Sequence, residues 1–224
     1  TQDVVYALPT VFGKARTGIP WLNIALLALT LVSVFIVGVG QHDQLYLPPL
    51  MVLTAQITGS TAAVPYPELM PTPEVWRAAL GTGVLYTLAL LGILGTHEMG
   101  HYLMSRRHGI SATLPFFIPF PNLLGTLGAV IAMREPTPNR KVQFDIGVAG
   151  PLAGLFVAIP VLLIGLLLSQ VGTVDQFIAN LPEALRGQTS IMSEGNSLAY
   201  LAAKFVVFGR ILPAGGEDVW IHPV

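Results

Sequence analysis

The sequence predicts an all-α integral membrane protein, a helical bundle of about three transmembrane spans with a re-entrant or β-hairpin element beside a candidate site. Hydrophobic residues make up 53% of the 224 residues and charged residues only 10%. Three apolar stretches reach the roughly 20 residues that a membrane-spanning helix needs. A fourth apolar stretch is interrupted by prolines and glycines, which prevent a continuous helix. One helical domain over residues 1–224 is the simplest interpretation.

Charge and cysteine content narrow the possible partners. The formal net charge is −1 and the chain has no basic run, which argues against nucleic acid as a partner and leaves the lipid bilayer as the expected surroundings. The chain has no cysteine, so it forms no disulfide and no thiolate metal site. Any metal ion must therefore be bound by histidine, aspartate or glutamate.

The first predicted span covers residues 21–39, an uninterrupted apolar run. Trp21 stands at its beginning, where aromatic rings favour the membrane interface. Residues 41–74 follow with six prolines and no lysine or arginine, so we expect a loop on the outer side of the membrane.

The second predicted span covers residues 76–104 and carries three ionisable residues, His97, Glu98 and His101. Ionisable groups inside a membrane are costly and usually functional. Residues four apart project from the same face of a helix, so His97 and His101 can offer two imidazole nitrogens to one ion. Glu98 would then lie beside the open position of the metal, as in the H-E-x-x-H arrangement of zinc hydrolases.

The alternative is that these three side chains only hydrogen-bond neighbouring helices. Packing contacts of that kind normally use serine, threonine, asparagine or a single histidine, and each contributes about 1 kcal/mol or less. A carboxylate next to two imidazoles is not needed for packing. The sequence therefore favours a catalytic site with Zn²⁺ as cofactor.

Basic residues indicate the orientation of the chain in the membrane. An excess of lysine and arginine in short loops marks the cytoplasmic side. At 1.5 Å per residue, Arg106 lies about 7 Å along the helix axis from His101 and about 13 Å from His97. We therefore expect the site to open toward the cytoplasmic face. The basic residues lie in the loop between the second and third predicted spans, residues 105–143, and are Arg106, Arg107, Arg134, Arg140 and Lys141.

Residues 113–133 form the re-entrant segment of the prediction. Non-helical backbone at membrane depth is tolerated only where it packs on protein or lines a cavity. We expect a strand over residues 127–133, whose edge could pair with an extended substrate. A plug that packs and binds nothing is the alternative. The segment is interrupted by Pro115, Pro119, Pro121, Gly125 and Gly128.

The third predicted span covers residues 142–169. Small residues on one helix face allow close helix approach, so this span should pack against the second. Asp145 could bind a metal, but a role at the start of the helix is favoured because a carboxylate interacts well with the helix dipole there. The small residues are Gly147, Gly150 and Gly154 on this span and Gly92, Gly95 and Gly100 on the second.

The remaining chain is predicted to be peripheral. Residues 170–196 are polar and are expected to form an outer loop. Residues 198–212 are apolar apart from Lys204 and Arg210, which suggests an interfacial amphipathic helix. Glu217, Asp218 and His222 are expected to be ordinary loop residues.

Several motifs together resemble the site-2 protease family of intramembrane zinc metalloproteases, with greatest similarity to the branch found in cyanobacteria and plastids. They are G-T-H-E-M-G-H-Y (95–102), P-F-F-I-P-F-P with G-T-L-G-A (125–129), N-R-K-V-Q-F-D-I-G-V-A-G-P-L-A-G (139–154) and the terminal E-D-V-W-I-H-P-V.

The resemblance implies regulated intramembrane proteolysis, the hydrolysis of peptide bonds in the transmembrane segment of a membrane-anchored protein. It implies that His97 and His101 bind zinc and that Glu98 is the general base. The strand thought to present substrate in the family matches Gly125, Thr126, Leu127, Gly128 and Ala129. The resemblance also implies a multi-pass membrane protein, located in the plasma membrane of a prokaryote or the plastid membrane of a plant.

The family takes its third zinc ligand from an aspartate in a later L-D-G motif. Two histidines alone leave a zinc site under-coordinated, because catalytic zinc normally has three protein ligands. We therefore expect either that the C-terminal part of the domain, with the third ligand, lies beyond Val224, or that this chain is inactive as it stands. The rival functions are an inactive family member that binds membrane proteins, and a metal transporter. The sequence argues against a transporter, because only one predicted span carries such a group of polar residues and no second one continues a pathway for the ion.

Overall fold

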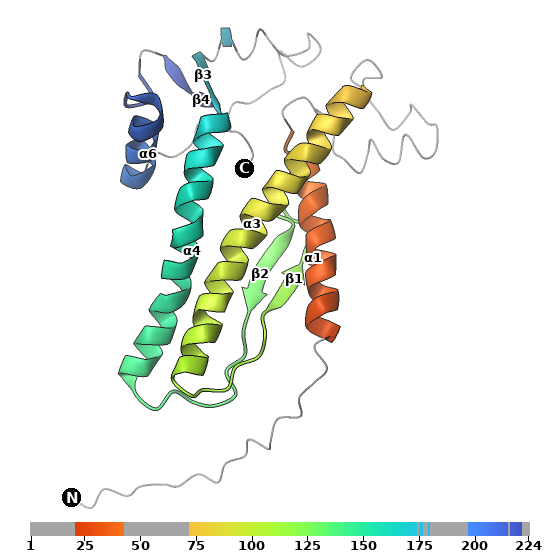
Figure 1. Cartoon of the computed structure of the whole chain (residues 1–224). Coiled ribbons are helices and arrows are strands. Elements are labelled where there is room, and N and C mark those ends of the chain that lie inside the picture. The colour runs from red at the N-terminus through yellow and green to blue at the C-terminus, as the bar shows by residue number, and fades with distance from the viewer. Residues whose placement is uncertain are drawn as a thin grey trace, which may run out of the picture.

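Three long helices, each long and apolar enough to cross a membrane, form the body of the protein. They are α1 (Trp21–Gly40), α3 (Pro73–Arg107) and α4 (Arg140–Leu168). Figure 1 shows the C-terminal part of α3 running beside α4 and its N-terminal part crossing beside α1. The computed structural model describes residues 21–42, 72–173, 175–176, 179, 197–214 and 216–220. These helices confirm the predicted fold class.

Capping residues explain where two of these helices begin. The Thr72 hydroxyl accepts a hydrogen bond from the Val75 N–H at 3.3 Å, and Pro73 occupies the first turn of α3, where a missing N–H costs nothing. The Asn139 side chain accepts from the Val142 N–H at 3.0 Å and caps α4. Both helices therefore have defined starting points, which fixes which residues face each other where they pack.

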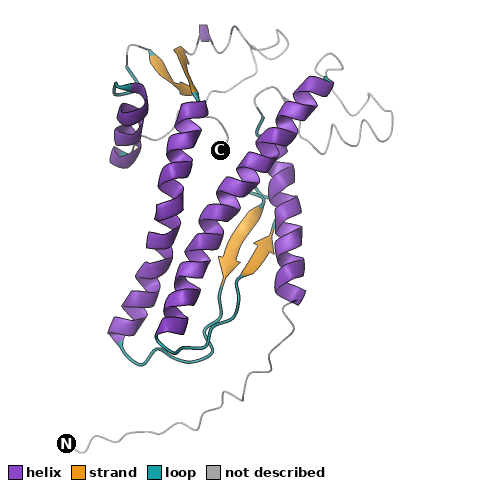
Figure 2. Ribbon diagram, viewed as in Figure 1, coloured by secondary structure: helices purple, strands orange, loops and turns teal. Residues whose placement is uncertain are grey.

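A two-stranded antiparallel hairpin lies between α1 and α3 (Figure 2). Its strands are β1 (Phe116–Pro119) and β2 (Thr126–Val130). The hairpin agrees with the predicted re-entrant or hairpin element. The strand expected over residues 127–133 ends at Val130, however, and Met133 makes only an isolated bridge to Ala112.

The turn of the hairpin is built by Asn122 and Gly125. The Asn122 Oδ1 accepts hydrogen bonds from the backbone N–H groups of Leu124 and Gly125, at 2.9 and 2.8 Å. Gly125 has φ +81°, and a β-carbon there would lie 2.6 Å from the Val34 Cα in α1. The turn therefore seats directly on the α1 backbone, which fixes the hairpin against the helices.

A small unit lies at the C-terminal end of α4. It consists of α6 (Leu198–Phe208) and a second antiparallel pair of strands, β3 (Gln170–Thr173) with β4 (Glu217–Trp220) (Figure 1). The prediction of loop structure was wrong for both strands. Strands of four residues carry too little alternation to be recognised, and their pairing joins segments far apart in sequence. Leu166, Leu212 and Val219 form the buried core of this unit.

The apolar segment predicted over 198–212 forms α6, which ends at Phe208. Its Lys204 is fully buried, bonded to Asp218 at 2.9 Å, with its Nζ 4.5 Å from the centre of the Tyr200 ring. Asp218 is therefore an ion-pair partner in a strand, not an ordinary loop residue. The interfacial position of the segment stays a prediction. Residues 1–20, His222, residues 180–196 and most of the 41–74 loop lie outside the described residues.

Candidate metal centre

Helix α3 carries the candidate site, because it continues without interruption through His97, Glu98 and His101. The helix has 35 residues and ends at Arg107, so the histidines lie within its last three turns. Its last turn is basic, with Arg106 and Arg107, which suits the negative end of the helix dipole. The sequence pattern at positions 97–101 thus has the helical conformation that a two-histidine site requires.

The two histidines converge on one point. The Nε2 atoms of His97 and His101 lie 3.1 Å apart, and the rings meet edge to face at 76° with centroids 4.8 Å apart. With zinc–nitrogen bonds of about 2.0–2.1 Å, two ligands of a tetrahedral ion lie about 3.4 Å apart. The observed separation is close to that value, so this pair of nitrogens fits a single zinc ion.

A backbone carbonyl of α4 orients the second histidine. The Nδ1 of His101 lies 2.7 Å from the carbonyl oxygen of Ile146. A carbonyl can only accept, so Nδ1 carries the proton and the lone pair of a neutral ring is on Nε2, on the side of His97. Histidines that bind a metal through one ring nitrogen commonly donate a hydrogen bond from the other, often to a backbone carbonyl. The Ile146 carbonyl was not foreseen, because a backbone atom leaves no signal in the residue types.

Glycines on α4 make room for the histidines. Gly150 lies against the His101 ring, and a β-carbon at Gly154 would lie 3.2 Å from the His97 Cβ. On α3, a β-carbon at Gly100 would lie 2.5 Å from the Ala149 carbonyl oxygen. The predicted close approach is therefore real at these positions. Gly147 is different, because a β-carbon there would meet nothing within 4 Å.

The acidic residue of the motif, Glu98, is buried on α3 with 7% of its surface exposed. Among the described residues, no three histidine, cysteine, aspartate or glutamate side chains form a group that could hold a metal ion. Asp145 is instead paired with His108, with 3.1 Å between Oδ2 and Nε2. The two histidines are thus brought together with each other but not with a third ligand in the described part of the chain.

The predicted substrate-binding residues belong to β2 and the turn before it. Phe117 of β1 is buried, and its Cζ lies 4.0 Å from where a β-carbon of Gly95 would be, two residues before His97. This contact brings the hairpin close to the histidine pair. Leu127 is an extra residue in the ladder, because Ile118 pairs with Gly128 and Pro119 with Thr126. Such bulges often lie next to functional sites.

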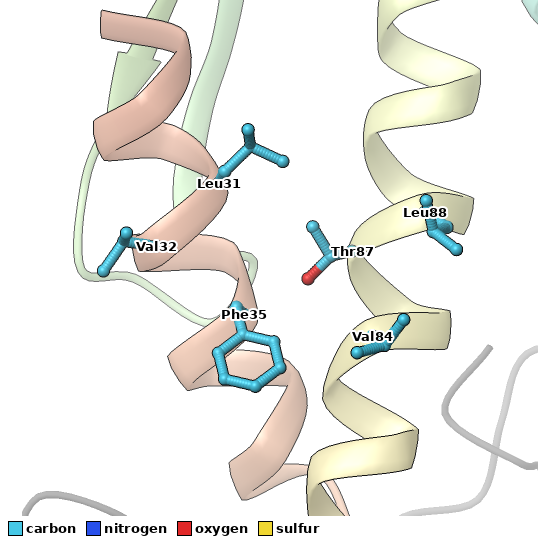
Figure 3. Close-up of a pocket in the computed structure, with 6 residues that line it drawn as sticks. All are labelled: Leu31, Val32, Phe35, Val84, Thr87 and Leu88. Atoms are coloured by element: carbon cyan, nitrogen blue, oxygen red, sulfur yellow. The ribbon is translucent and has the colours of Figure 1, made fainter. Parts of the chain in front are cut away.

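A separate apolar cavity of about 320 Å³ lies between α1 and α3 (Figure 3). The Thr87 hydroxyl in its wall donates to the Gly83 carbonyl at 2.7 Å, so the cavity offers no free polar group from that side chain. Leu88 precedes His97 by nine residues, about 14 Å along the helix. The cavity is therefore remote from the histidines. Its lining residues are Leu31, Val32, Phe35, Val84, Thr87 and Leu88.

The fold and the site together define a helical protein suited to a membrane, with two histidine side chains whose Nε2 atoms lie 3.1 Å apart. The family model described as Peptidase family M50 matches residues 85–211, which include α4 and the histidine motif. The chain belongs to peptidase family M50, and the predicted membership of the site-2 protease family is confirmed.

Two plant proteins are similar in sequence to this chain. "Probable zinc metalloprotease EGY1, chloroplastic" of Oryza sativa subsp. japonica is 31% identical over 206 residues, 91% of this chain and 33% of that protein. The protein of the same name in Arabidopsis thaliana is 29% identical over 155 residues, 69% of this chain and 26% of that protein. The chain spans about a third of the length of these relatives or less. No solved structure matches it.

Proposed function

We propose that this chain is the core of a zinc-dependent intramembrane endopeptidase that hydrolyses peptide bonds in the transmembrane segment of a membrane-anchored protein. The observation that carries the proposal is the 3.1 Å separation of the His97 and His101 Nε2 atoms on a helix apolar enough to cross a membrane. Family membership and the zinc metalloprotease names of the relatives support it.

The residues of the chain have distinct roles in this proposal. His97 and His101 would hold the zinc ion, which when bound would lower the pKa of a water molecule and polarise the scissile carbonyl. Glu98 accepts the proton that water loses as its oxygen adds to the scissile carbonyl carbon. Glu98 then delivers that proton to the amide nitrogen as the C–N bond breaks. Catalytic zinc normally has three protein ligands, and the described residues bring two candidate ligands together.

The substrate helix must unwind before its carbonyls can be attacked, because helical hydrogen bonds and side chains shield them. In our proposal the hairpin supplies replacement partners through Gly125, Thr126, Leu127, Gly128 and Ala129. The edge of β2 that does not face β1 has no strand partner among the described residues. An extended peptide can add to such an edge through backbone hydrogen bonds.

Arg106 and Arg107 lie at the end of α3, and Arg140 and Lys141 lie at the start of α4. These basic residues support an orientation in which the site is toward the positive-inside face of the membrane. The word chloroplastic in the relatives' names favours a plastid membrane among the possible compartments.

The test uses the full-length protein in liposomes with a single-span model substrate. We expect one zinc ion per chain by atomic emission, and its loss in His97→Ala and His101→Ala. Glu98→Gln should keep zinc and lower the cleavage rate by about 10²–10⁴-fold, the usual contribution of a general base. Glu74→Gln, an exposed carboxylate in the first turn of α3, is the matched control and should cleave normally.

Three outcomes would reject the protease. If the purified protein contained no stoichiometric divalent metal, the proposed metal site would be rejected. A cellular phenotype that survives Glu98→Gln would favour a binding module for membrane proteins. Metal flux across liposomes without peptide cleavage would indicate a transporter.

A further inference from the structure

An ion pair joins the C-terminal end of α3 to the first turns of α4. The Nε2 of His108 lies 3.1 Å from the Oδ2 of Asp145, and the two side chains are 27% and 32% exposed. His108 is the capping residue of α3, with its backbone N–H directed at the Met104 carbonyl at 3.1 Å. The pair therefore ties two helix termini together.

Asp145 directly precedes the residue whose carbonyl orients the candidate zinc ligand. The Ile146 carbonyl accepts from His101 Nδ1 at 2.7 Å, and its position is set by the α4 backbone. A shift or rotation of α4 relative to α3 at this level would lengthen that hydrogen bond. The contact between Asp145 and His108 resists such a movement, since it is only one residue away along the chain.

Apolar packing holds the same helix ends together but is less directional. The Ile146 side chain is 4% exposed and forms a buried cluster with Ile110 and Val142, against which Met104 packs. Contacts of this kind depend on the distance between the helices and are only weakly sensitive to a small slide along their axes. The ion pair between His108 and Asp145 instead joins two specific atoms, which lie 3.1 Å apart.

We propose that Asp145 and His108 are positioning residues for the metal centre. They hold α4 in register with α3, so that the Ile146 carbonyl keeps the His101 Nδ1 proton and the Nε2 lone pair stays directed toward His97. The inference rests on the proposed zinc site. It gives Asp145 a role that differs from both sequence-based interpretations, metal ligand and helix-start residue.

The test measures zinc affinity of the full-length protein in detergent by competition with a chelator. Loss of a residue that hydrogen-bonds a metal ligand directly lowers metal affinity by about 10–100-fold, and loss of a residue acting through such a partner should lower it by less, about 3–10-fold. We expect Asp145→Ala and His108→Ala each to cause this loss. The double variant should lose no more than either single variant, because both remove the same contact.

The matched control is Glu217→Ala, which removes the acidic partner of Arg210 from another ion pair, 2.7 Å long, in the α6 and β4 unit. It should leave zinc affinity unchanged. A cobalt-substituted protein gives a second measurement, since its visible spectrum should shift in Asp145→Ala and stay constant in Glu217→Ala. His108→Ala removes the same contact from α3 and supplies the test if Asp145→Ala does not fold.

Unchanged zinc affinity and an unchanged cobalt spectrum in both single variants would overturn the inference, as would equal losses in Glu217→Ala or additive losses in the double variant. These results would leave the protease proposal standing if the wild type binds zinc and depends on Glu98. A wild-type protein that binds no zinc would reject the proposed function itself.

Discussion

Gly150 lies so close to the imidazole ring of His101 that a β-carbon at this position would overlap the Nε2, Cε1 and Cδ2 atoms. The glycine is on α4 and the histidine on α3, so this contact sets how closely the two helices approach at the candidate metal centre. Gly100 and Ala149 make the reciprocal contact from α3 to α4. The small residues are therefore part of the site as well as of the helix packing.

Gly150→Ala should disrupt zinc binding. The new methyl group would push the His101 ring away from His97 and from the Ile146 carbonyl. We expect zinc affinity to fall by at least about 10-fold, the lower limit when a metal ligand loses the hydrogen bond that orients it. Chelator competition measures it. Gly147→Ala is the control, one turn earlier on α4 with nothing within 4 Å of an added β-carbon. Equal affinities for both variants would contradict the prediction.

Gly100→Ala should destabilise the contact between α3 and α4. Its β-carbon would lie 2.5 Å from the Ala149 carbonyl oxygen and 2.9 Å from the Ala153 Cβ. Overpacking of this kind costs about 1–3 kcal/mol. Gly81→Ala places a methyl group in open space on the same helix and should stabilise it by about 1 kcal/mol through helix propensity. Thermal unfolding in detergent should therefore move in opposite directions for the two variants.

Asp218→Ala should destabilise the α6 and β4 unit strongly, because it removes a carboxylate that pairs with the fully buried Lys204 ammonium at 2.9 Å. Removing one partner of a buried ion pair costs about 3–5 kcal/mol. Glu217→Ala removes the partner of Arg210 in an exposed pair and should cost about 1 kcal/mol or less. Hydrogen exchange of the β3–β4 amides is the measurement. Similar protection in both variants would argue against the prediction.

Thr126→Val should impair substrate cleavage while leaving zinc affinity intact. The Thr126 hydroxyl donates to the Ile118 carbonyl at 2.8 Å and accepts from the Gly128 N–H at 3.0 Å, so it braces the bulge at Leu127. Without it the edge of β2 should lose its shape, and we expect a several-fold loss of kcat/KM on the model substrate. Thr82→Val removes a hydroxyl that bonds only within α3 and should cleave normally. A loss confined to zinc affinity would show that Thr126 acts on the metal centre instead.

The parts of the fold that follow from apolarity and periodicity could be predicted from the sequence. Long apolar runs identified the three helices, and the four-residue spacing of His97 and His101 predicted the convergence of their side chains. Prolines in the 113–133 segment predicted its departure from helix. In each of these cases the information is local, contained within one turn of helix or one span.

The features that were missed depend on contacts between distant parts of the chain. The pairing of β3 with β4 joins residues almost fifty positions apart and leaves no pattern within either strand. The partner of Asp145 is His108, which a reading of α4 alone cannot identify. Gly147 looked equivalent to Gly150 by spacing, yet only Gly150 meets a neighbour, because the crossing point of the helices decides which glycines are used.

The hydrogen bond from His101 to Ile146 ends on a main-chain oxygen, and this limits how the contact can be altered. Exchanging the side chain at position 146 for another aliphatic one leaves the acceptor in place, so protein engineers could vary that residue without touching the histidine's support. A change in the path of the helix would remove it. Mutational scans based on side chains alone would therefore overlook this acceptor of the His101 hydrogen bond.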